Sequence, residues 1–177
     1  SVPAAVRAQM RAYAWCEDEF GDTDHFPPQL YVREARRMVG AAVVTENSLQ
    51  SAAELGNESI AMGLYSFDCH PVQIVADEQQ ATTSLEGCIG ASPRRAYQIP
   101  YGAITPRRRE GSNLLVPVAL SASHVAFSTI RMELTWMAIG HAAGVAAAMA
   151  TAAVQDVDRA ELQAQLLREG QVTSLGG

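Results

Sequence analysis

A histidine in a segment rich in hydroxyl groups is the first place where the sequence could do chemistry. His124 lies close to Ser121, Ser123, Ser128 and Thr129. Imidazole titrates near neutral pH, so this side chain can transfer a proton or orient a polar substrate. Loops carry functional residues more often than packed helix faces do. We therefore take His124 as a catalytic candidate, with a structural capping role as the alternative.

The elements on either side of this polar loop must position it. Residues 113–119 have the length of a short apolar strand, which Pro117 would end, bend or place at a sheet edge. A long helix is expected over 131–153. Its Gly140 and Gly144 share one face, because residues four apart lie above one another on a helix. That face can approach a sheet or a flat ligand closely, and the first turn offers free N–H groups to electron-rich atoms.

The rest of the sequence predicts two further helices and leaves two segments undecided. A helix is expected over 2–16, and another begins at Asp158 and ends near Gly170. In 30–45 arginines alternate with apolar residues, which fits either a strand along a polar cavity or a helix with solvated arginines. Residues 47–58 fit a polar connection or a short helix. The expected fold is α+β, with a mixed or antiparallel sheet, packed helices and one long buried Ala/Gly-rich helix.

Composition excludes several functions. The 177 residues are 48% hydrophobic and 18% charged, which is typical of a globular protein. All 13 basic residues are arginine, so no lysine of this chain can form a Schiff base or bind a phosphate in a P-loop. The net charge of −6 disfavours nucleic-acid partners. No Asp, Glu or Arg occurs between Glu133 and Asp156, but this stretch is mainly Ala and Gly and contains His141. It therefore predicts a buried helix and no membrane interaction.

The cysteines give no metal or disulfide pattern. Cys16, Cys69 and Cys88 are far apart and form no C-x-x-C pair, so we expect three separate small apolar side chains. No metal site is expected, because the acidic residues near His25 do not complete a ligand loop. The first residues do not have the basic-then-apolar pattern of a signal segment, and both cytoplasmic and exported locations remain open.

Four segments, in the expected order, resemble the FAD-dependent oxidoreductase family of the glutathione-reductase-like flavoprotein class. They are LYVREARRMVG at 30–40, FDCHP around His70, IPYGAITP at 99–106, and NLLVPVALSASHVAFSTIRMELTWMAIGHAAGVAAAMA at 113–150. The resemblance covers about residues 30–150. It implies hydride transfer between FAD and a small substrate, for which a polyhydroxylated or carbohydrate-like compound is one option.

The resemblance also implies roles for particular residues. The start of the long helix would stabilise negative charge on the reduced flavin. His124 and His70 would transfer protons or orient the substrate. Arg33 and Arg37 would anchor the substrate, and they share a face if their segment is a strand. The backbone expected to approach the flavin is that of Ser128, Thr129, Ile130, Arg131 and Met132.

One part of the family pattern is missing. No two glycines are spaced as G-x-G, so the chain lacks the G-x-G-x-x-G turn of an amino-terminal Rossmann element. On the resemblance, it is a carboxy-terminal portion of a two-domain flavoprotein and is inactive alone, without bound FAD. Residues 1–112 would belong to the substrate side. Residues 113–177 would be the last strand–helix element of the FAD-binding domain, followed by a terminal helix. The expected partners are the missing FAD-binding region, the substrate and, through exposed apolar surface, a second copy.

Two alternatives come from other functional classes. In a non-catalytic module that binds carbohydrate or protein, the histidines would be structural. A hydrolase could use Ser121 or Ser123 with His124, but the sequence has no G-x-S-x-G turn to expose the nucleophile.

Overall fold

The computed structural model describes residues 2–29, 31–51, 53–77, 79, 82–87 and 91–175. The chain divides into two compact units, Ser1–Glu34 and Ala35–Gly177. Helices and small antiparallel sheets occur in the same chain, which confirms the predicted α+β class. No helix within the described residues is long and apolar enough to cross a membrane.

The first unit contains one short helix, α1 (Ala4–Met10), and a 3-10 turn at Gly21–Thr23. The helix predicted over 2–16 is therefore much shorter. Pro3 precedes α1 as its N-cap, where its fixed φ is harmless, but α1 has no side-chain cap and buries no residue. Without a buried face, nothing extends it beyond its first turns.

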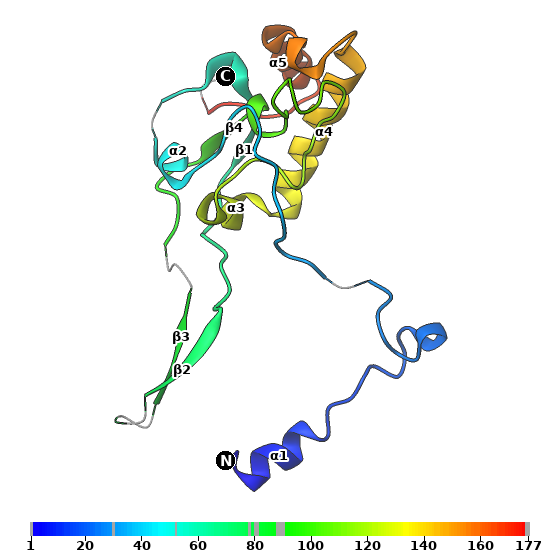
Figure 1. The fold of residues 1–177 in the computed structure, drawn as a ribbon, viewed down its shortest axis with the longest axis vertical. Helices are drawn as coiled ribbons and strands as arrows, with labels where there is room; N and C mark the ends of the chain where they lie inside the picture. Colours follow the sequence, from blue (N-terminus) through cyan, green and yellow to red (C-terminus); the bar gives the residue numbers. More distant parts are fainter. Residues whose placement is uncertain are drawn as a thin grey trace. The chain divides into compact units, whose positions relative to one another are not determined.

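The second unit is built on a two-stranded sheet (Figure 1). Strand β1 (Ser59–Gly63) pairs antiparallel with β4 (Tyr97–Pro100). The long helix α4 (Glu133–Met149) packs against β1, and α5 (Arg159–Arg168) packs against α4. The residues that α4 buries repeat every three or four positions, as expected for one helix face; they are Thr135, Ile139, Ala142, Ala143 and Ala146.

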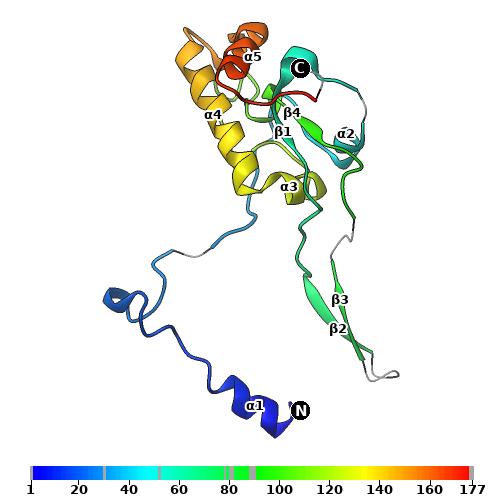
Figure 2. The same cartoon turned by 180° about the vertical axis from the view of Figure 1, so that it is seen from behind.

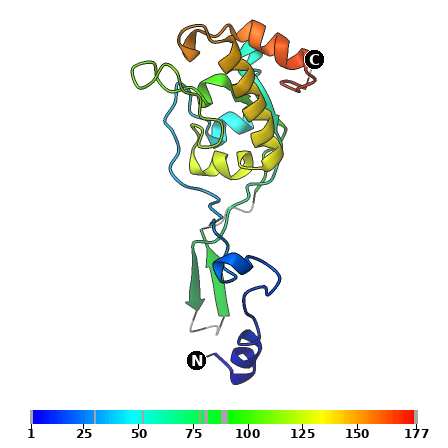
Figure 3. The same cartoon turned by 90° about the vertical axis from the view of Figure 1, so that its right-hand side faces the viewer.

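Two short helices also belong to this unit. Helix α2 (Glu46–Gln50) begins with a capping box, in which the Thr45 and Ser48 side chains bond each other's backbone N–H groups. It forms within the segment predicted as a polar connection or short helix. Helix α3 (His124–Ile130) has Ser123 as its N-cap and leads directly into α4 (Figure 3). The predicted loop over 121–129 is thus mostly helical, because the Ser123 hydroxyl satisfies the Ala126 N–H at 3.2 Å.

A separate hairpin is formed by β2 (Gln73–Asp77) and β3 (Thr82–Glu86) (Figure 2). Ile74 is paired with Leu85 across the two strands. Both side chains are exposed, so the hairpin contributes little to the buried core.

Neither the strand expected at 113–119 nor the strand that was one of two options for 30–45 forms within the described residues. In the first segment, single bridges join Gly40 to Pro106 and Val44 to Ala122. A Cβ at Gly40 would lie 2.8 Å from a backbone oxygen, so only glycine permits this approach. The alternative helix is absent as well.

In residues 113–119, the backbone bonds go to separate loop residues instead of a partner strand. Val116 N–H donates to the oxygen of Ile104 at 2.8 Å, and the Ala119 oxygen accepts from Met38 at 2.9 Å. Pro117 lacks an N–H between them, which interrupts any ladder.

The carboxy-terminal expectations are largely correct. The long helix forms, although it begins at Glu133 and ends at Met149. The Asp158 carboxylate accepts from the N–H groups of Ala160 and Glu161, and α5 follows. Gly170, with a φ of +82°, comes just after it, as a helix-ending glycine should.

The cysteine prediction is wrong for one residue. Cys69 is disulfide-bonded, whereas Cys16 is free and exposed. Cys88 lies outside the described residues. Sequence spacing could not reveal the bond, since the folded backbone decides which cysteines meet. The described residues contain no cluster of His, Cys, Asp and Glu suited to a metal ion.

Candidate functional site

The corner between α3 and α4 collects the candidate residues Ser128, Thr129, Ile130, Arg131 and Met132. Met132 is the N-cap of α4, and its backbone oxygen accepts from Trp136 at 2.9 Å. No side chain of the described residues caps this helix. Its first-turn N–H groups can therefore serve another acceptor, although Glu133 places a negative charge in the same turn.

Thr129 connects this corner to the sheet. Its hydroxyl donates to the backbone oxygen of Tyr65 at 2.8 Å, and the Tyr97 hydroxyl lies 3.0 Å from the same oxygen atom. Because the threonine proton is already used, Tyr97 is the donor in the second bond. Burial raises the pKa of Tyr97 to about 12, which keeps this hydroxyl protonated. Tyr97 and Thr129 thus fix the end of α3 against β4.

Asp68 joins two candidates that are far apart in the sequence. Its carboxylate lies 3.5 Å from the Arg131 guanidinium and 3.8 Å from His70 Nε2. Its backbone oxygen also accepts from Arg131, and its N–H donates to the oxygen of Ser128 at 3.2 Å. The segment containing His70 is therefore held along the end of α3.

Burial differs sharply within this cluster. The Arg131 side chain is 6% exposed, whereas those of Asp68 and His70 are 41% and 50% exposed. A buried cation requires a counter-charge and hydrogen bonds, and Asp68 supplies both to Arg131. His70 remains open to a ligand. Asp68 was missed by the sequence analysis; its place two residues before His70 in FDCHP was the available signal.

His124 lies on a helix and not in the loop predicted for it. It is the first residue of α3 and is exposed. The Ser123 hydroxyl is used as the cap of this helix, and Ser121 is completely buried. Neither serine is an accessible nucleophile beside an imidazole, which argues against the hydrolase alternative.

The two arginine candidates have different surroundings. Arg33, in the first unit, lies over the Tyr31 ring at 5.0 Å. Arg37, in the second, donates to the oxygen of Ala122 at 2.9 Å and lies 5.1 Å from the centre of the Phe127 ring. The strand face that they were expected to share does not form, so their joint role stays a prediction.

One face of α4 is open. A Cβ added at Gly140 or Gly144 would meet no atom within 4 Å, and Leu134 and Met137 are 80% and 68% exposed. Packing against the sheet within the described residues therefore does not explain the glycines. We call the face formed by Met137, Gly140, Gly144 and Ala148 the open face of α4.

Fold and site together define an α+β protein in which a long helix starts beside a buried arginine and presents an uncovered small-residue face. Residues 3–166 match the model of the family described as FAD dependent oxidoreductase. Since this match covers most of the chain, the protein belongs to that family, whose members are oxidoreductases that use FAD. No curated protein and no solved structure matches the chain.

Proposed function

We propose that this chain forms the flavin-ring side of an FAD-dependent oxidoreductase that transfers a hydride between FAD and a small substrate. The observation that carries the proposal is the position of the α4 amino terminus, which has no side-chain cap and lies next to buried Arg131. A polyhydroxylated or carbohydrate-like compound is the substrate class that we propose to screen first.

The residues at the corner fit part of a flavin. The N–H groups of the first turn of α4 and the Arg131 guanidinium are donors with positive potential, which suits the electron-rich edge of the ring system. The missing Cβ atoms of Gly140 and Gly144 leave space where a flat group can lie against the helix. The backbone that would hold the flavin is that of Ser128, Thr129, Ile130, Arg131 and Met132.

Bound FAD would supply the hydride chemistry. The residues of this chain would position the reactants. Asp68 holds Arg131 in place, so that its charge can stabilise the anionic edge. His70 would move a proton through Nδ1, the ring nitrogen that does not face Asp68, and exposed His124 would orient the substrate or move a second proton. Arg33 and Arg37 would bind its acidic or hydroxyl groups.

We also infer that the natural polypeptide contains an amino-terminal FAD-binding region that covers the open face of α4. Two observations support this inference: the sequence has no G-x-G spacing, and the exposed apolar side chains of α4 have no cover within the described residues. In this proposal residues 113–177 complete the FAD-binding domain, residues 1–112 contribute to the substrate side, and the chain alone is inactive. Without that region, the same face would lead to self-association.

The test is a visible absorption spectrum of the natural polypeptide that contains this chain, compared with the 177-residue chain mixed with FAD. We expect a flavin spectrum only in the longer protein, and dithionite should bleach it. Arg131→Gln should release flavin, whereas Arg108→Gln, at an exposed ion pair, should not. A colourless longer protein that fails to take up added FAD would contradict the proposal and favour the non-catalytic binding module.

A further inference from the structure

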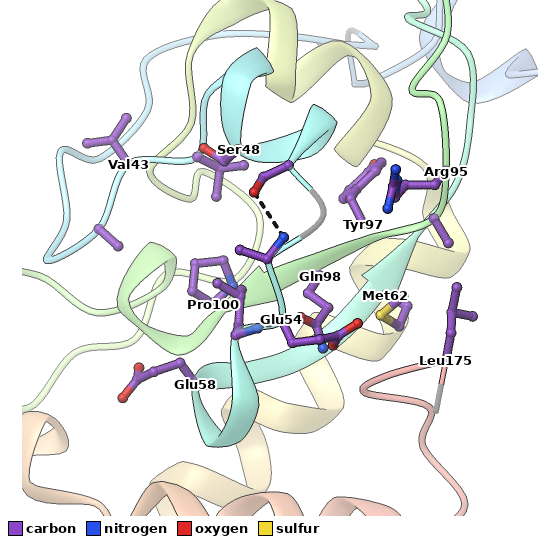
Figure 4. Close-up of a pocket in the computed structure, with 16 residues that line it drawn as sticks. Val43, Ser48, Glu54, Glu58, Met62, Arg95, Tyr97, Gln98, Pro100 and Leu175 are labelled. Atoms are coloured by element: carbon purple, nitrogen blue, oxygen red, sulfur yellow. Dashed lines mark hydrogen bonds between the residues drawn. The ribbon is translucent and has the colours of Figure 1, made fainter. Parts of the chain in front are cut away.

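A cavity lies beside the β1–β4 sheet, away from the α3–α4 corner. Met62, Gln98 and Pro100 are less buried than their neighbours along the two strands, and all three line it (Figure 4). Its volume is about 470 Å³, within the range of sites for small molecules. Tyr97 also lines it, and the Tyr97 hydroxyl points to Thr129. Tyr97 thus borders this cavity and bonds through its hydroxyl to the end of α3.

Side-chain to backbone bonds hold the rims of the cavity. Gln98 Oε1 accepts from the N–H of Leu55 at 2.7 Å, and Gln98 Nε2 donates to the oxygen of Thr173 at 3.0 Å. The Thr173 oxygen also accepts from the buried Ser59 hydroxyl at 2.6 Å. One glutamine of β4 therefore connects the segment before β1 with the segment near Thr173. The cavity is formed before any ligand arrives, which lowers the ordering cost of binding.

The walls are mostly apolar and carry three charged side chains, all of them exposed. Among the three charged residues of the lining, Glu58 lies 3.8 Å from Arg159 Nε. Within the described part of the chain, neither Arg95 nor Glu54 has an ion-pair partner, and they do not pair with each other. The apolar side chains of the walls include Val43, Val44, Leu55, Met62, Pro100 and Leu175.

We propose that this cavity binds the zwitterion of a short apolar peptide. The terminal carboxylate would bond to the Arg95 guanidinium, whose fork of donors matches two carboxylate oxygens. The terminal ammonium would pair with Glu54. A free amino acid carries the same two charges but only one side chain, which would leave much of the apolar volume unfilled. A dipeptide separates its charges, and its two side chains fill the apolar volume.

The experiment is a calorimetric titration of the 177-residue chain with leucyl-leucine, N-acetyl-leucyl-leucine and leucyl-leucinamide. The last two probes each lack one terminal charge. We expect the unmodified dipeptide to bind most tightly, and each blocked form to bind about three- to fivefold more weakly, the effect of one solvent-accessible ion pair. Equal affinities for the three probes, or no heat with any of them, would overturn the proposal.

Two variants test which residue binds each charged end of the dipeptide. Arg95→Gln should remove the preference for the free carboxylate and keep the preference for the free amine, and Glu54→Gln should do the reverse. Arg94→Gln is the matched control, because Arg94 is the exposed neighbour outside the lining. The same loss in Arg94→Gln as in Arg95→Gln would contradict the assignment.

A filling variant tests the location. Met62→Trp should abolish binding while the far-UV circular dichroism stays unchanged. Ala53→Trp, at an exposed position of the lining, tests the same point if Met62→Trp does not fold. Undiminished binding in a folded filling variant would exclude this cavity. None of these titrations requires flavin, so their outcome is separate from that of the oxidoreductase proposal.

Discussion

Arg131 and Asp68 form an ion pair in which the cation is buried and the anion reaches the surface. The guanidinium lies 3.5 Å from the carboxylate, and the arginine also donates to the backbone oxygen of the same aspartate. The two residues come from segments that regular secondary structure does not connect. Their pairing fixes the FDCHP segment against the corner where α3 ends and α4 begins.

Replacing Asp68 by asparagine should destabilise the chain. The substitution keeps the backbone bond to Arg131 but removes the carboxylate charge that lies 3.5 Å from the buried guanidinium. We expect a loss of about 1–2 kcal/mol, less than for a fully buried pair because Asp68 is accessible to water. Urea unfolding measures this loss. Asp156→Asn removes the partner of exposed Arg108 and should cost less than about 0.5 kcal/mol. Equal losses in the two variants would mean that the burial of Arg131 is not the cause.

Gly63 is required by the ring of Tyr97. A Cβ at Gly63 would lie 2.6 Å from the Tyr97 ring and hydroxyl, so Gly63→Ala must displace the ring and disturb its bond to Thr129. We expect a loss of about 1–3 kcal/mol in chemical denaturation, as for overpacking in a core. Gly111→Ala is the control, since its Cβ would meet Pro106 at an ordinary 3.7 Å. If Gly63→Ala proved as mild as the control, the close contact would not constrain the sheet.

His141 and Glu169 should make stability depend on pH. His141 Nδ1 lies 2.6 Å from the side-chain oxygen of Gln171, and His141 Nε2 lies 2.5 Å from the Glu169 carboxylate. The bond to Gln171, followed by the effect of Glu169, raises the pKa of His141. Bonds from Gln165 and then His141 lower the pKa of Glu169.

The signs of these shifts define a pH window. Protonated His141 stabilises the fold below its ordinary pKa of 6.5, and this contribution is lost as pH rises through the raised value. Ionised Glu169 stabilises the fold above its ordinary pKa of 4.5, and its contribution is lost as pH falls through the lowered value. Stability from this pair is therefore greatest between pH 4.5 and 6.5. In His141→Gln, the fall in Tm between pH 6 and pH 8 should be smaller than in the wild type. An unchanged fall would show that another group is responsible.

Gly144→Leu should have opposite effects on the stability of this chain and on flavin binding by the natural polypeptide. A Cβ at this position would meet no atom within 4 Å and leucine favours helix, so the 177-residue chain should gain about 0.5–1 kcal/mol. In the natural polypeptide the same side chain would obstruct whatever lies against the open face, and flavin retention should fall at least about tenfold, a cost of about 1.4 kcal/mol. Ala164→Leu, on the exposed side of α5, should leave flavin retention unchanged. Full retention in Gly144→Leu would argue against close approach at this face.

Local signals in the sequence predicted the helices better than the strands. The cap at Asp158 and the end at Gly170 depend on neighbouring residues, so they can be read without knowing the fold. A strand requires a partner, and residues 113–119 find only the separate backbone groups of Ile104 and Met38. The helix α3 was missed because its cap, Ser123, stands among other polar residues and looked like part of a loop.

The candidate site shows the same division. His70 and the 128–132 segment could be named from their motifs, but the residue that joins them could not. Asp68 matters because folding brings it next to Arg131. Arg131 follows the buried helix α3, and its burial could not be known from the sequence. In the same way, Gly140 and Gly144 were correctly placed on one helix face, but only the structure could tell which neighbours that face lacks.

The bonds between β1 and the last residues of the chain have a consequence for synthesis. Ser59 donates to the oxygen of Thr173, and Gln171 donates to the oxygen of Ile60, so the carboxy-terminal segment runs beside β1 (Figure 2). During translation β1 leaves the ribosome long before these partners exist. The bonds of β1 to this segment can form only after more than a hundred further residues have been synthesised. Until then, an unpaired strand edge can pair with other nascent chains. Consolidation of this unit therefore comes only after residues 171–173 have been synthesised, and slow codons before Gln171 would prolong the time during which the nascent chain is open to misassembly.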